Sequence, residues 1–134
     1  MICVLDASAM IAYLGGETGA DIVSGILLDS AHQCAAHALN LCEVYYDFHR
    51  ASGEAVAKEA IRDLMAIGVR PRDDLSTEFW QTAGALKATH RRISLAHCFA
   101  VTLAKASGGA LITSDHHEFD ALVAQGVCAV TFIR

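Results

Sequence analysis

Four side chains that can bind a metal ion lie where apolar segments of the sequence end or begin. Asp6 ends the first apolar run, and similar junctions further along the chain hold Glu43, His97 and Asp115. If the apolar segments form a parallel sheet, these junctions gather at the carboxyl ends of the strands, where open α/β sheets bind ligands. Carboxylates that converge there repel one another unless a cation lies between them. The pattern therefore indicates a site for a hard divalent ion, Mg²⁺ or Mn²⁺.

The elements that must position this site follow from the apolar spacing. Short strand-like runs are expected at Ile2–Asp6, Cys34–His37, Gly68–Pro71, Ala110–Thr113 and Ala129–Ile133. Helical periodicity predicts helices at Ser8–Leu14, Asp21–Leu28, Asn40–Ser52, Glu54–Ile67, Thr77–Thr89, Leu95–Ala106 and Glu118–Gln125. This alternation implies an α/β fold with a mainly parallel, doubly wound sheet.

The composition bounds the class of protein. With 134 residues, of which 54% are hydrophobic and 19% charged, the chain is expected to form one domain over residues 1–134, with a sheet buried on both faces. The net charge of −5 argues against a strongly basic nucleic-acid-binding domain but leaves room for a local basic rim. Five cysteines without a Cys-x-x-Cys pair favour reduced thiols in the cytoplasm. No signal peptide and no apolar run of about 20 residues is expected.

The densest polar cluster of the sequence follows the fourth strand-like run and extends from Thr113 to Asp120. Asp115 is its best metal-ligand candidate. Asp120 is a second one, and it fits equally well as an ordinary carboxylate in the first turn of a helix. His116 and His117 lack further His or Cys ligands at the spacing of a zinc site, so we interpret them as part of a solvated turn.

Structural roles compete with the functional interpretation at three positions. Asp6 can cap the helix that follows it, and Asn40-x-x-Glu43 has the spacing of a capping box. Ser8 fits a helix cap or a hydrogen-bond donor better than a nucleophile, because no histidine–aspartate arrangement identifies an activated serine.

Four short motifs together resemble the PIN domain family, particularly the VapC-like toxin ribonucleases of bacterial toxin–antitoxin pairs. In chain order they are Val4-Leu5-Asp6-Ala7-Ser8-Ala9, Asn40-x-x-Glu43, Ser94-Leu95-Ala96-His97-Cys98-Phe99-Ala100 and Leu111-Ile112-Thr113-Ser114-Asp115. The resemblance implies a flavodoxin-like, three-layer α/β/α fold and RNA cleavage with Mg²⁺ or Mn²⁺. It also implies a cognate antitoxin protein and a homodimer as partners.

The resemblance also implies roles for individual residues. Asp6, Glu43 and Asp115 match acids that are catalytic and bind the metal. Asp120 matches an additional acid of some members, and Ser8 and Thr113 match polar supporting positions.

His97 departs from the family pattern, which places an aspartate at that position. No Asp or Glu occurs between Thr89 and Ala110, so the sequence loses one negative charge there. A neutral imidazole can still bind a metal, and Mn²⁺ accepts nitrogen better than Mg²⁺ does. Two interpretations stay open. Either His97 is a metal ligand of an active ribonuclease, or it marks a catalytically weakened PIN-like module that binds RNA or an antitoxin.

An acidic protein can act on an acidic polymer when a carboxylate-held cation neutralises the phosphate. Arg91 and Arg92 precede the helix of His97, and they are therefore the predicted RNA-binding residues, with Arg70, Arg72 and Lys87 as further candidates for a basic rim. A response-regulator receiver domain shares the fold class. However, it needs an acidic pair after the first strand, where Asp6 stands alone.

Overall fold

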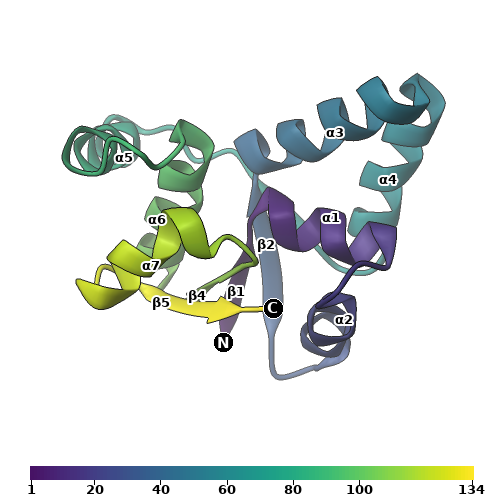
Figure 1. The fold of residues 1–134 in the computed structure, drawn as a ribbon, viewed down its shortest axis with the longest axis horizontal. Coiled ribbons are helices and arrows are strands. Elements are labelled where there is room, and N and C mark those ends of the chain that lie inside the picture. Colours follow the sequence, from purple (N-terminus) through teal and green to yellow (C-terminus); the bar gives the residue numbers. More distant parts are fainter.

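The computed structural model describes all 134 residues, and its five strands form one parallel sheet in the order β3-β2-β1-β4-β5 (Figure 1). The strands are β1 (Ile2–Leu5), β2 (Gln33–His37), β3 (Arg70–Arg72), β4 (Ala110–Thr113) and β5 (Ala129–Phe132). Each strand is joined to the next through one or two helices, because parallel strands need a long crossover connection. The helices are α1 (Ala7–Gly15), α2 (Ala20–Leu28), α3 (Ala38–Ser52), α4 (Glu54–Ala66), α5 (Thr77–Thr89), α6 (Leu95–Ser107) and α7 (His116–Ala124).

Helices cover both faces of the sheet, which makes the fold a three-layer α/β/α structure. Residues of α1 to α4 form a core with one face, and residues of α5, α6 and α7 form a second core with the other (Figure 1). Side chains of a strand point alternately to opposite faces. Accordingly, Cys3 and Leu5 enter the first core while Val4 enters the second. The expected fold class and order of elements are confirmed.

The start of three helices differs from the sequence-based expectation, because residues at strand ends act as caps. Asp6, rather than Ser8, caps α1 by accepting a hydrogen bond from the Ala9 amide at 2.9 Å. His37 caps α3 through its Nδ1, so Asn40-x-x-Glu43 is not a capping box. Asp115 caps α7, which therefore begins two residues earlier than expected.

The pairing of β1 with β4 brings two polar side chains together at the carboxyl end of the sheet. Leu5 lies beside Ile112 in the register, and the Asp6 amide donates to the Ile112 carbonyl at 3.1 Å. Close approach at the other end depends on Gly109, where an added Cβ would lie 2.2 Å from the carbonyl oxygen of Ile2. This register places Thr113 next to Asp6.

None of the seven helices has the length and apolar character needed to cross a bilayer. All five cysteines are free thiols. Burial, together with the nearby Cys3, raises the pKa of Cys34 to about 11.

Candidate functional site

The Asp6 carboxylate is completely buried at the end of β1. Its Oδ1 accepts hydrogen bonds from Ser8 Oγ at 2.7 Å and from the Ala9 amide at 2.9 Å, and its Oδ2 accepts one from Thr113 Oγ1 at 2.5 Å. Burial raises the pKa of Asp6, and these hydrogen bonds together with the nearby His97 oppose the rise only in part. The structure thus places Ser8 and Thr113, the two residues predicted for polar supporting positions, on the Asp6 carboxylate.

His97 lies in the first turn of α6 between Asp6 and two carboxylates of α7, with only 7% of its surface exposed. Its Nε2 is 3.4 Å from Asp6 Oδ2. Its Nδ1 is 2.5 Å from Glu118 Oε2 and 4.0 Å from Asp115 Oδ2. Glu118 is thus the nearest ion-pair partner of Nδ1, which forms no hydrogen bond.

Asp115 and Glu118 present their carboxylates to His97 from the start of α7. Asp115 Oδ1 accepts a hydrogen bond from the Glu118 amide at 3.0 Å, and Glu118 Oε1 accepts one from the Ser94 amide at 2.5 Å. Each carboxylate therefore has one oxygen held by a backbone N–H group and a second oxygen that faces the ring. Ligand atoms of His97, Asp115 and Glu118 all lie within 4.8 Å of one another.

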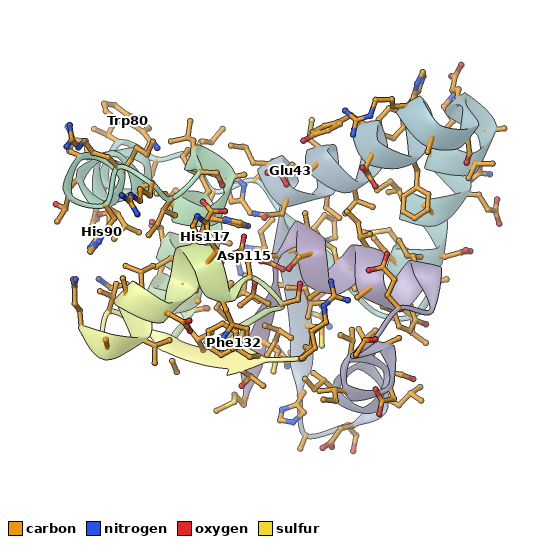
Figure 2. The ribbon with its side chains drawn as sticks, viewed as in Figure 1. Glu43, Trp80, His90, Asp115, His117 and Phe132 are labelled. Atoms are coloured by element: carbon orange, nitrogen blue, oxygen red, sulfur yellow. The ribbon has the colours of Figure 1, made fainter.

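Glu43 is half-buried in the second turn of α3, near the start of the helix (Figure 2). Burial raises the pKa of Glu43; His97 lowers it, and the charges of Asp6 and Glu118 raise it further. These mutual effects mark Glu43 as a neighbour of the same cluster. Asn40, one turn earlier, is fully buried and donates through Nδ2 to the Ala96 carbonyl at 3.2 Å, which ties α3 to the start of α6.

The structure keeps Asp120 apart from this cluster. Asp120 is exposed, and its Oδ1 lies 3.1 Å from Nδ1 of His116. The other ring nitrogen of His116 lies 2.7 Å from the Arg134 carbonyl, and the ring stacks on Phe132 with 3.8 Å between centroids. The contact with Arg134, followed by that with Asp120, raises the pKa of His116. His117 is also exposed and lies apart from Phe132 (Figure 2).

Arg91 and Arg92, the predicted RNA-binding residues, are exposed in the turn between α5 and α6. Lys87 holds this turn, because its Nζ donates to the carbonyls of Arg91 and Ile93, both at 2.7 Å. The turn leads directly into Ser94, whose hydroxyl caps α6. Of the other basic candidates, Arg72 forms an ion pair with Asp74, with 2.8 Å between its guanidinium nitrogen and the carboxylate oxygen.

The donor groups of this site fit a divalent cation. Three carboxylates and one imidazole converge from the ends of β1 and β4 and the first turns of α6 and α7. The buried Nδ1 of His97 has no hydrogen-bond partner, and free oxygens of Asp115 and Glu118 face it. A cation among these atoms would give Nδ1 a partner and relieve the repulsion between the two carboxylates.

The model of the PIN domain family matches residues 3–124 of the sequence. The chain belongs to the PIN domain family. No curated protein matches the sequence. Solved structures with the same fold include VapBC2 from Rickettsia felis bound to a DNA fragment from its promoter. That chain has a TM-score of 0.74 and 13% identity, with 98% of each chain covered.

Two further structures extend this likeness. DNA-bound VapBC from Salmonella typhimurium has a TM-score of 0.74 at 12% identity and covers 100% of this chain and 99% of its own. VapC20 from Mycobacterium tuberculosis is a toxin that cleaves the sarcin–ricin loop. It has a TM-score of 0.69 at 15% identity, and the match covers 89% of this chain and 94% of the VapC20 chain. At such identities the likeness is one of fold.

One residue of this PIN domain site was missed by sequence reasoning. Glu118 was treated as part of a polar stretch and not as a ligand candidate. Its spacing of three residues from Asp115 was the available signal, because residues i and i+3 lie on the same side of a helix. That signal depends on α7 beginning at His116, which makes Asp115 its cap.

Proposed function

We propose that this PIN domain is a metal-dependent endoribonuclease and the toxin of a toxin–antitoxin pair. The observation that carries the proposal is the convergence of Asp6, His97, Asp115 and Glu118 at the carboxyl end of the sheet in a PIN fold. Asp6, His97, Asp115 and Glu118 are the proposed ligands of Mg²⁺ or Mn²⁺, and Glu43 is the fifth residue of the site. Asp120 is left out, because it contacts His116 instead.

A divalent cation held there would neutralise charge on a phosphate oxygen and activate water for attack on the phosphodiester bond. The protein's own groups fix the site around it. Thr113 and Ser8 orient the buried Asp6, and Ser94 and the cap geometry of Asp115 orient the carboxylates of α7. We assign Glu43 the role of accepting a proton from the attacking water, because it lies half-buried on α3, which Asn40 ties to the start of α6, and burial raises its pKa.

The surroundings support the proposed substrate and partners. Arg91 and Arg92 offer exposed positive charge beside the start of α6, where the RNA backbone would pass. Large apolar side chains are exposed on α2, α3 and α4, namely Ile22, Leu28, Tyr46 and Val56. We propose that this apolar surface serves the homodimer and the cognate antitoxin, in the cytoplasm.

A second candidate is a catalytically weakened module that binds RNA or an antitoxin. It is favoured by His97, which removes an acid from the site and occupies the space between Asp6 and Glu118. The two candidates differ in whether added metal produces cleavage.

Cleavage of RNA by the purified protein with Mg²⁺ or with Mn²⁺ tests the proposal. We expect cleavage that a chelator stops and that Asp115→Asn abolishes. Asp63→Asn is the matched control, because Asp63 is exposed on α4 away from the site, and this variant should cut RNA as well as the parent protein. RNA that stays intact with both metals would favour the weakened module. Cleavage that survives chelation would refute a metal-dependent mechanism.

A further inference from the structure

We propose that Cys3 and Cys34 form a binding site for a soft, thiol-seeking cation, Cu⁺, at the amino end of the sheet. Both cysteines stand near the start of their strands, β1 and β2. The acidic cluster lies at the carboxyl ends of the sheet, so the two sites are separate. Binding of Cu⁺ by the cysteines does not depend on the proposed nuclease activity.

The two cysteines are direct neighbours in the parallel pairing of β1 with β2. Cys3 is the register partner of Cys34, and both side chains enter the first core; the starts of the two strands lie away from α3 in Figure 1. Paired strands are about 4.8 Å apart. Side chains on one face stand roughly perpendicular to the sheet, so two cysteines in the same rotamer hold their Sγ atoms at about that spacing.

This spacing suits a bridging ion better than a disulfide. A disulfide needs its two Cβ atoms about 3.5–4.5 Å apart, which is closer than neighbouring strands lie. Metal–thiolate bonds in zinc sites are about 2.3 Å long, so an ion midway between two sulfurs spans about 4.6 Å. Cu⁺ is a soft ion that thiolates select, and two sulfur ligands in a line are sufficient to hold it.

A cavity leads from the surface to one of the two thiols. Cys34 lines a cavity of about 200 Å³ together with Asp29, His32 and Arg70. Nε2 of His32 lies 3.5 Å from Asp29, while its Nδ1 is buried and has no hydrogen-bond partner. The charges of Asp29 and Arg70 balance each other, so the cavity offers little to a hard divalent ion. Sulfur and an unpaired imidazole nitrogen favour a soft ion instead.

Binding of the ion replaces two protons. Burial raises the pKa of Cys3, and burial together with the nearby Cys3 raises the pKa of Cys34 to about 11, so both groups are thiols in the metal-free chain. Each sulfur releases its proton to solvent as it binds the ion. Copper stays in the +1 state throughout, and no oxidant or reductant is consumed.

X-ray absorption at the copper edge counts the sulfur ligands directly. The full chain is loaded with one equivalent of Cu⁺, supplied as its acetonitrile complex under nitrogen. We expect two sulfur neighbours for each copper ion. A single sulfur neighbour, or nitrogen and oxygen neighbours alone, would overturn the proposal. This measurement needs no substitution, so it tests the site even where a cysteine variant does not fold.

Variants identify the two sulfurs. Cys34→Ser and Cys34→Ala should each weaken Cu⁺ binding by more than the roughly 10- to 100-fold loss that follows removal of a residue which only orients a ligand. Competition with a coloured Cu⁺ chelator measures the affinity. Cys98→Ser is the matched control, because Cys98 is equally buried but belongs to the core on the other face of the sheet, and its affinity should equal that of the parent.

The exposed thiol of Cys42 is the competing site for copper. Cys42→Ser should leave both the affinity and the two sulfur neighbours unchanged. Loss of Cu⁺ binding in Cys42→Ser, or equal affinity of Cys34→Ser and the parent protein, would place the ion outside the pair of strands and refute the proposal.

Discussion

Replacing Asp6 by asparagine is expected to stabilise the metal-free protein while it impairs metal binding. Asparagine has nearly the same shape, and its Oδ1 can keep the hydrogen bonds from Ser8 and from the Ala9 amide. Its amide group can donate to Thr113 Oγ1, because a hydroxyl group also accepts. The substitution therefore removes a buried charge without removing the hydrogen bonds around it.

The magnitude follows from the balance at this carboxylate. Burying an ion costs several kcal/mol, and each hydrogen bond to a charged group returns roughly 1.5–3 kcal/mol. The raised pKa of Asp6 shows that burial outweighs the three hydrogen bonds and the nearby His97. We therefore expect Asp6→Asn to raise the free energy of unfolding at neutral pH, and Tm with it, by an amount within the roughly 0.5–3 kcal/mol of most single substitutions.

The pH dependence gives this prediction a sign. Because the folded pKa of Asp6 lies above its ordinary value of 3.8, the stability that the group contributes is fully present below that value and is lost as the pH rises through the folded pKa. The advantage of the asparagine variant should thus be absent in acid and grow as the pH rises. Urea denaturation with a chelator present, at a series of pH values, measures it. A variant less stable than the parent at pH 7, or a difference that does not depend on pH, would refute the reasoning.

Three further predictions follow from the site and the fold. His97→Asp should raise Mg²⁺ affinity relative to Mn²⁺, because it exchanges nitrogen for oxygen; titration calorimetry that gives equal Mg²⁺ binding in the two proteins would contradict this. Gly109→Ala should lower stability by roughly 1–3 kcal/mol, since its Cβ would meet the Ile2 carbonyl at 2.2 Å; an unchanged Tm would show that the strands yield there. Light scattering should give twice the mass of one chain, and a single-chain mass at micromolar concentration would exclude the homodimer.

Local patterns were sufficient to predict the order of the elements and the family. Buried parallel strands read as short apolar runs, and helices between them show a 3.6-residue period, so the twelve elements follow from spacing. The helix starts were less predictable, because the caps of α1, α3 and α7 are residues that end strands or loops. Of these, only Asp6 was considered as a cap, beside its role as a metal ligand. Asp6 and Asp115 each have two roles, because one oxygen of the carboxylate caps a helix and the other lies near the ring of His97.

Of the candidate site, only the residues within the four sequence motifs could be predicted. Asp6, His97 and Asp115 do converge, because they follow neighbouring strands or open the helix packed against them. Which ring nitrogen of His97 lies next to which carboxylate depends on side-chain conformations, and these cannot be predicted from the spacing of residues in the sequence. Asp120 lies outside the cluster because it is exposed one helical turn after His116 and contacts that ring.

The cluster also suggests how the missing aspartate at position 97 is compensated. Glu118 brings a carboxylate from α7 to the ring of His97, so the site still has four acids, Asp6, Glu43, Asp115 and Glu118. His97→Asp alone would crowd a fifth acid into this space and should destabilise the metal-free fold through like-charge repulsion. Adding Glu118→Gln should recover much of that loss, so the two substitutions should couple by about 0.5–2 kcal/mol in a double-mutant cycle, measured by urea denaturation with a chelator. Additive effects of the two substitutions would mean that Glu118 does not occupy the electrostatic role of the absent aspartate.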